Sequence, residues 1–353
     1  MNPVKPTRNE FVDYAKGILI FLVTLGHVIQ FVVYRNDGFY GDYLFRAIYL
    51  FHMPLFMALA GYVTCGSLSR TAPGEFIIRR IINLLLPIFC WSVLAESLFF
   101  AAHHGRDLPQ AARDLADLFF GSLWFLWALF EASVIVAVAR TWRWDKAWFA
   151  VASSVLITLL VPDFGKLYLF KFTYPFFCLG YLAAQQREVT AMVCRNKPVL
   201  FLAGVAGVMA FLGWREETYV YVSKMTVTSH TAGIIIFRLA AGIVASIAAL
   251  WLMHLLYQRL PRKWVIWLGN RSLYIFILQT YFFATLTRAL RPEPPHALRN
   301  QLIALTLAPV VAALLAGGFG LASRMAERFP TMALLFFGRQ QGAKPAPVAK
   351  NVG

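Results

Sequence analysis

The sequence predicts an all-α integral membrane protein with about ten transmembrane helices and both termini in the cytoplasm. Hydrophobic residues make up 59% of the 353 residues and charged residues 14%, whereas soluble globular proteins contain roughly 45–50% and about 25%. The mean hydropathy is +0.62, and a chain this apolar has too few polar residues to cover its surface in water. Soluble enzymes, nucleic-acid-binding modules and disordered scaffolds are therefore excluded.

Ten stretches are candidates for spans, because a membrane-crossing helix needs about 20 mostly apolar residues. In order, they cover residues 14–34, 43–66, 81–102, 119–139, 147–162, 167–185, 198–214, 231–257, 264–287 and 301–323. The fifth and sixth are the weakest, since residues 162–166 interrupt them with a proline, an aspartate, a glycine and a lysine.

The connections between these stretches are too short to hold a soluble domain. Residues 1–330 are therefore predicted to form a single transmembrane domain, and residues 331–353 a cytoplasmic tail. The distal part of the tail is polar and contains proline, so it is predicted to be disordered. The four cysteines show no CxxC or paired spacing and are interpreted as small buried hydrophobes; no metal site is expected.

The distribution of positive charge predicts the orientation. The chain has 33 Lys and Arg against 17 Asp and Glu, and in membrane proteins Lys and Arg concentrate in cytoplasmic loops. With the N-terminus inside, each of the first five inside segments carries three Lys or Arg residues and the tail from Arg324 carries five, against nine in all outside loops together. The inside segments would be residues 1–16, 67–80, 140–146, 186–197, 258–263 and 324–353. The basic balance therefore indicates topology and not a nucleic-acid partner.

Ionisable side chains within a span are costly and are functional candidates by default. Lys16 and His27 are eleven residues apart, so on a helix they share one face about 16 Å apart along the axis. Asp13 and Thr24, each three residues earlier, join the same stripe. The alternative interpretation is that Lys16 extends to the inner surface and His27 only hydrogen-bonds a neighbouring helix.

Other polar residues lie in or beside later spans. His52 precedes a Met-Pro pair, where a ring nitrogen could point inward; a packing contact is the alternative. Arg79 and Arg80 stand at the predicted cytoplasmic surface, either as a positive anchor or as a site for a phosphate-bearing ligand, for which a planar guanidinium is well suited. Glu131 and Arg271 are fainter candidates, more typical of helix-pairing contacts.

Six sequence blocks carry a resemblance to a known family. The blocks are DYAKGILIFLVTLGH at 13–27, FHMPLFMALAGY at 51–62, RRIINLLLP at 79–87, LWFLWALF at 123–130, FFCLGYL at 176–182 and LGNRSLYIFILQTY at 268–281. Together they resemble the membrane acyltransferase 3 family, especially its fucose 4-O-acetylase-like branch of sugar acetyltransferases. The resemblance implies transfer of an acyl group, most often acetyl, from cytoplasmic acyl-CoA to a hydroxyl of an extracytoplasmic or lipid-linked glycan.

The family signature in the first helix is a basic residue, usually Arg, then ten residues, then His. Here the pair is Lys16 and His27, and lysine at this place fits the sugar acetylase branch. The family's two arginines three apart are replaced by the adjacent Arg79 and Arg80. Many relatives have a histidine where this chain has Gln279, so that position is not predicted to be catalytic.

The leading hypothesis is an O-acyltransferase of the bacterial inner membrane that uses acetyl-CoA and a surface carbohydrate such as exopolysaccharide or O-antigen. His27 is predicted to be the general base or acid–base relay, and Lys16, steered by Asp13, to act electrostatically at the donor end. Arg79 and Arg80 are predicted to hold the CoA phosphates. The predicted substrate-cavity residues are His52, Glu131 and Arg271. Besides membrane lipid, the expected partners are acyl-CoA and the glycan.

Two alternatives come from other functional classes. A glycan or small-anion transporter would also line its path with polar residues, but a carrier is expected to show paired broken helices in its two halves. A non-catalytic scaffold would leave the Lys16–His27 stripe without a purpose.

Overall fold

The structure, a computed structural model, describes residues 9–102, 107–260, 262–289 and 297–338, and every regular element in these ranges is a helix. The all-α prediction is therefore confirmed. In chain order the elements are α1 (Glu10–His27), η1 (Val28–Val33), η2 (Phe39–Gly41), α2 (Tyr43–Leu68), α3 (Pro73–Arg80), η3 (Ile81–Leu85), α4 (Leu86–Ala102), α5 (Leu108–Gly121), α6 (Trp124–Thr141), α7 (Ala147–Leu160), α8 (Leu167–Gln185), α9 (Arg187–Arg195), α10 (Lys197–Gly213), η4 (Glu216–Thr218), α11 (Val220–Ser223), α12 (Thr231–Arg259), α13 (Lys263–Gly269), α14 (Ser272–Ala289), α15 (Ala297–Ala326) and α16 (Pro330–Phe337).

Seven helices of the described ranges are long and apolar enough to cross a membrane. They are Glu10–Val33, Tyr43–Leu68, Pro73–Ala101, Trp124–Thr141, Leu167–Gln185, Thr231–Arg259 and Leu298–Ala326. An eighth candidate is a pair of helices, Arg187–Val193 and Lys197–Gly213, bent by 72°. The two other expected spans contain the shorter apolar helices Ala147–Leu160 and Ser272–Thr287. The protein is thus a multi-pass helical membrane protein, and ten crossings stay a prediction.

Glycines allow the central helices to cross at very short range. A Cβ atom added to Gly17 of α1 would lie 1.9 Å from the Val265 carbonyl oxygen, and one added to Gly269 of α13 would lie 1.7 Å from the Asp13 carbonyl oxygen. At the crossing of α2 and α8, a Cβ on Gly61 would lie 2.0 Å from the Phe177 oxygen. Since lipid tails are as apolar as the side chains, close backbone contact between small residues is a main source of helix association in membranes.

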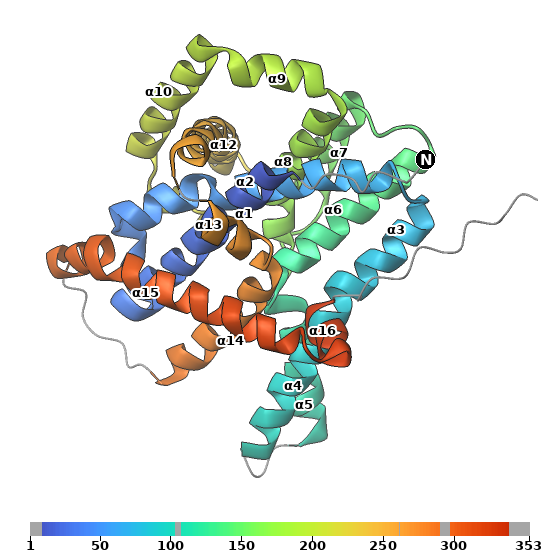
Figure 1. The fold of residues 1–353 in the computed structure, drawn as a ribbon, viewed down its shortest axis with the longest axis vertical. Helices are drawn as coiled ribbons and strands as arrows, with labels where there is room; N and C mark the ends of the chain where they lie inside the picture. The colour runs from blue at the N-terminus through green and yellow to red at the C-terminus, as the bar shows by residue number, and fades with distance from the viewer. Residues whose placement is uncertain (1–8, 103–106, 261, 290–296, 339–353) are drawn as a thin grey trace, which may run out of the picture.

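Figure 1 shows α4 and α5 as a hairpin that extends from one end of the helix bundle, whereas α9 lies across the opposite end. The last described helix, α16, packs against α4, and Trp91 Nε1 donates a hydrogen bond to the Phe336 carbonyl oxygen at 2.8 Å. The first part of the predicted tail is therefore a helix in contact with the bundle. The part predicted to be disordered lies outside the described residues.

The predicted orientation is testable with single cysteines in a variant that lacks the four native ones. Ser69 and Glu216 are both exposed, in a predicted inside and outside segment respectively. We expect Glu216→Cys to react with a membrane-impermeant maleimide on intact cells and Ser69→Cys only after permeabilisation, because the basic segments stay in the cytoplasm. A reversed labelling pattern would overturn the orientation.

Candidate active site

The polar stripe on α1 begins with an ion pair and continues into a contact with α14. Lys16 Nζ lies 3.2 Å from Asp13 Oδ1, one helical turn earlier. Further along, the buried Thr24 hydroxyl donates to Gln279 Oε1 of α14 at 2.7 Å. Polar groups that meet across buried helices in this way orient the two helices relative to each other.

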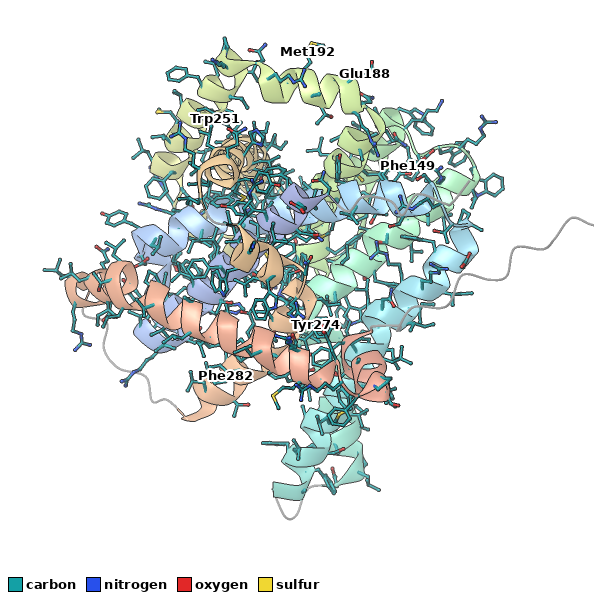
Figure 2. All side chains as sticks on the ribbon, viewed as in Figure 1. Phe149, Glu188, Met192, Trp251, Tyr274 and Phe282 are labelled. Atoms are coloured by element: carbon teal, nitrogen blue, oxygen red, sulfur yellow. The ribbon has the colours of Figure 1, made fainter. Side chains whose placement is uncertain are left out.

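A cavity of about 410 Å³, which we call the Arg80 cavity, lies at the Lys16 end of this stripe. Its polar lining residues are Lys16, Arg80, Asn83, Asn270, Ser272 and Tyr274. No acidic residue is among the described residues that line it, but Lys16 is paired with Asp13 just outside the lining, so Arg80 supplies most of its positive character. Tyr274 lies inside the helix bundle, whereas Glu188 and Met192 lie on α9 at its edge (Figure 2).

The structure separates the two adjacent arginines. Arg80 lines the cavity, donates to Thr64 Oγ1 at 2.9 Å and stacks over Phe76, with 4.9 Å between its Cζ and the ring centroid. Arg79 does not line it; it is exposed and pairs with Glu75 at 2.5 Å. Neighbouring residues on a helix point about 100° apart, so only one of the two can face the interior.

A second cavity, of about 350 Å³, lies around His27 and is called here the His27 cavity. Its wall is mainly aromatic, and no charged residue is among the described residues that form it. The side chains with hydrogen-bonding groups are His27, Gln30, Tyr40, Tyr49, His52, Ser122, Trp124, Tyr221 and Thr280. A pocket of this composition suits a neutral, partly apolar group that carries hydroxyls.

The two imidazoles of this cavity differ in the hydrogen bonds that their ring nitrogens make. His52 is buried, and its Nδ1 lies 2.9 Å from the Ile48 carbonyl oxygen. A carbonyl only accepts, so Nδ1 carries the proton and Nε2 keeps its lone pair. His27 contacts the rings of Phe31 and Phe283 at 5.6 and 5.4 Å, and its Nδ1 has no hydrogen-bond partner among the described residues. Both rings can therefore take part in proton transfer.

Two of the candidate residues, His27 and Arg80, are each followed directly by a π-helical segment. His27 ends α1 and is followed directly by η1, Val28–Val33. Arg80 ends α3 and is followed directly by η3, Ile81–Leu85. Such segments insert an extra residue into a helix and are frequent at functional sites. His27 and Arg80 are therefore distinguished both by their place in a cavity lining and by the unusual helix geometry that follows them.

The two cavities share part of their lining. Val23, Met53 and Phe276 each contribute to both. Val23 lies seven residues after Lys16 and four before His27, on the same face of α1. Lys16, Val23 and His27 therefore line the two cavities from one face of α1, whereas Asp13 and Thr24 of the predicted stripe line neither.

Glu131 and Arg271 line neither cavity. Glu131 is half-buried in α6, and Arg271 pairs with Glu327 at 3.3 Å and lies over the Trp267 ring. No group of three or more His, Cys, Asp or Glu residues within the described ranges is placed to hold a metal ion.

Sequence reasoning missed most of the aromatic wall of the His27 cavity. Tyr49 lies on the same helix as His52, with 4.5 Å between the ring centroids, and spacing of three residues could have indicated it. Tyr221 belongs to a predicted outside loop, more than 160 residues from Tyr49 in sequence. No local pattern indicates that such a loop returns to the cavity.

The chain is similar to known proteins over most of its length. The model of the acyltransferase domain family, acyltransferase 3, matches residues 9–323. Two proteins named nodulation protein NolL are each 33% identical over 281 residues, or 77% of this chain. That of Sinorhizobium fredii (strain NBRC 101917 / NGR234) is covered over 77% of its length and that of Mesorhizobium japonicum (strain LMG 29417 / CECT 9101 / MAFF 303099) over 75%. No solved structure matches this chain significantly. The chain belongs to the acyltransferase domain family and is a multi-pass membrane acyltransferase.

Proposed function

We propose that this acyltransferase moves an acetyl group from cytoplasmic acetyl-CoA to a hydroxyl of an extracytoplasmic or lipid-linked glycan of the bacterial surface, such as exopolysaccharide or O-antigen. Its place would be the bacterial inner membrane. The observation that supports this most is the pair of cavities that meet at Val23, Met53 and Phe276. One is cationic and lies at the predicted cytoplasmic end; the other is neutral, aromatic and contains two imidazoles.

In this proposal the Arg80 cavity holds the donor. CoA carries several phosphate charges, and Arg80 supplies positive charge without an acidic side chain in the lining, while Lys16 adds an ammonium group that is paired with Asp13. Charge-assisted hydrogen bonds from arginine to phosphate are among the stronger polar contacts. The acetyl thioester would then reach the junction of the two cavities, where the acceptor hydroxyl arrives from the other side.

His27 is proposed as the general base. The acceptor oxygen attacks the thioester carbonyl carbon while His27 takes the hydroxyl proton, so a C–O bond forms as the C–S bond breaks. CoA leaves as the thiolate and recovers the proton from the imidazolium. His52, whose Nε2 keeps a lone pair, is the second candidate for this role.

The test is purified protein in liposomes with radiolabelled acetyl-CoA and a glycan-lipid extract of the source membranes. We expect transfer of label to the glycan, with release of CoA. Passage of the glycan across the membrane without label transfer would contradict the proposal and favour the transporter alternative.

The two arginines provide a matched pair for the donor site. Arg80→Ala is expected to raise KM for acetyl-CoA roughly tenfold or more, because a hydrogen bond to a charged group contributes about 1.5–3 kcal/mol. Arg79→Ala removes the same charge from the neighbouring position but outside the cavity, and KM should change less than about twofold, since exposed ion pairs contribute little. Equal KM values in the two variants would remove Arg80 from the donor site.

A further inference from the structure

Arg238 is the most deeply buried cation of the described residues, with 0% of its surface exposed, and it lies in the span formed by α12. Its guanidinium contacts five groups, and none of them is a carboxylate. The acceptors are the carbonyl oxygens of Thr218 (2.6 Å), Lys224 (2.6 Å) and Glu217 (3.4 Å), Ser223 Oγ and Met225 Sδ (3.3 Å). All five belong to one short piece of chain, residues 217–225.

This piece has little regular structure of its own. It consists of the 3₁₀ turn η4 and the four-residue helix α11, and Lys224 has a φ of 52°. One helical turn is not stable by itself, and its last carbonyl groups need donors from elsewhere. The planar guanidinium, with five N–H donors in a fixed fork, supplies donors to three carbonyls at once.

Two further residues, Arg46 and Asp163, hold the ends of the same segment. Arg46 Nη1 donates to the Trp214 carbonyl oxygen at 3.0 Å. Asp163 accepts from the Met225 backbone N–H at 2.8 Å, from Thr226 Oγ1 at 2.7 Å and from Lys171 Nζ at 2.7 Å. Burial alone would raise the pKa of Asp163, but these hydrogen bonds lower it overall, so the carboxylate stays charged. Residues 214–226, called here the 214–226 segment, are therefore fixed at both ends and along the middle.

The 214–226 segment carries one side of the His27 cavity. Tyr221 lines that cavity, and its ring centroid lies 6.4 Å from that of Tyr49 and 6.5 Å from that of Trp124. Tyr219 packs on Tyr40, another lining residue, with 4.8 Å between centroids. Without the hydrogen bonds from Arg238, the backbone of the segment would no longer hold these aromatic rings in fixed positions.

We propose that Arg238 is a positioning residue that holds the 214–226 segment so that Tyr221 forms the acceptor side of the His27 cavity. The inference rests on the proposed function for the meaning of that cavity, but the contact between Arg238 and the segment does not. An arginine buried in a span is expensive, and a role in shaping the acceptor site explains its position.

The test begins with Arg238→Gln, because the glutamine amide has two N–H donors and can replace only some of the hydrogen bonds that the guanidinium makes. We expect hydrogen exchange of backbone amides in residues 214–226 to become at least tenfold faster, with the rest of the protein unchanged. In the transfer assay with the glycan-lipid extract, KM for that extract should rise about tenfold, while KM for acetyl-CoA should change less than twofold. Ser246→Ala, a buried polar change on the same helix away from the segment, should alter neither measurement.

A double substitution distinguishes positioning from general damage. Tyr221→Ala should raise KM for the extract by itself, and Arg238→Gln combined with Tyr221→Ala should be no worse than the worse single variant, because the two act through one element. Additive effects, or an equal rise in both KM values, would overturn the proposal.

Two outcomes concern the protein and not the role of Arg238. If Arg238→Gln does not fold, the test uses Arg238→Lys, which keeps the charge and three donors. Exchange in residues 214–226 should then be faster than in the wild type, by less than the rise expected for Arg238→Gln. If the wild-type protein transfers no acetyl group, the proposed function fails, and exchange in residues 214–226 still decides whether Arg238 holds the segment. Wild-type protection of residues 214–226 in the variant that folds, Arg238→Gln or otherwise Arg238→Lys, would contradict the inference in either case.

Discussion

His27→Gln is expected to lower the rate of acetyl transfer by about 10²–10⁴-fold, the usual contribution of a positioned general base. Glutamine keeps a hydrogen-bonding side chain of similar length but cannot take a proton at neutral pH. His27 packs against the rings of Phe31 and Phe283, and glutamine, which is similar in length, retains part of this packing. The measurement is turnover at saturating acetyl-CoA, with folded protein quantified by size-exclusion chromatography.

Two variants of the same cavity serve as comparisons. Gln30 lines the cavity, donates a hydrogen bond to Asn36 Oδ1 and cannot act as a base. We therefore expect Gln30→Ala to lower the rate of acetyl transfer less than tenfold. His52→Gln asks whether the second imidazole is the base. A near wild-type rate for His27→Gln together with a large loss for His52→Gln would transfer the catalytic role to His52.

Gly180→Ala is expected to prevent the normal crossing of α2 and α8. A Cβ at this position would lie 1.8 Å from the Ala58 carbonyl oxygen and 2.7 Å from its Cα, and backbone atoms cannot move aside as a side chain can. We expect destabilisation above about 3 kcal/mol, at the upper end of overpacking effects. The measurements are the thermal unfolding midpoint in detergent and the yield of monodisperse protein.

Gly204→Ala is the matched control, because a Cβ there meets no atom within 4 Å. Glycine within a helix is less favourable than alanine by roughly 0.5–1 kcal/mol, so this substitution should leave the unfolding midpoint unchanged or raise it slightly. The two glycine-to-alanine changes should thus have opposite signs. A stable Gly180→Ala variant would show that the two helices do not cross as closely as described.

Local sequence patterns predicted the helix face that matters most. Lys16 and His27 share a face by the geometry of an α-helix alone, and the structure places each of them in the lining of one cavity, whereas Asp13 and Thr24 of the predicted stripe line neither. The all-helical class followed from apolar length, because a chain in lipid must satisfy its own backbone hydrogen bonds. These predictions needed no knowledge of which helices are neighbours.

The remaining features depend on contacts between distant segments. Arg79 and Arg80 are chemically alike, and only the packing of α3 decides that Arg80 faces the cavity. Glu131 was a candidate because of its charge, but its helix turns it away from both cavities. The contacts of Arg238 with residues 217–225 join an intramembrane helix to a loop, and no periodicity of either segment encodes them.

The π-helical segment after His27 makes the length of this part of the chain a constraint in its own right. Tyr34 N donates to the Ile29 carbonyl oxygen five residues back, at 3.0 Å, so the turn holds one residue more than an α-helix would. Deleting Val28 or Ile29 would let this turn wind as an ordinary α-helix, and the chain beyond it would keep nearly its present direction, because the wider turn already accommodates the extra residue. Inside the turn the register would change: Phe31, whose ring packs near the imidazole, would follow His27 by three residues instead of four. Two relatives with identical residues around the histidine but a one-residue difference in this turn would therefore surround the imidazole with differently placed rings.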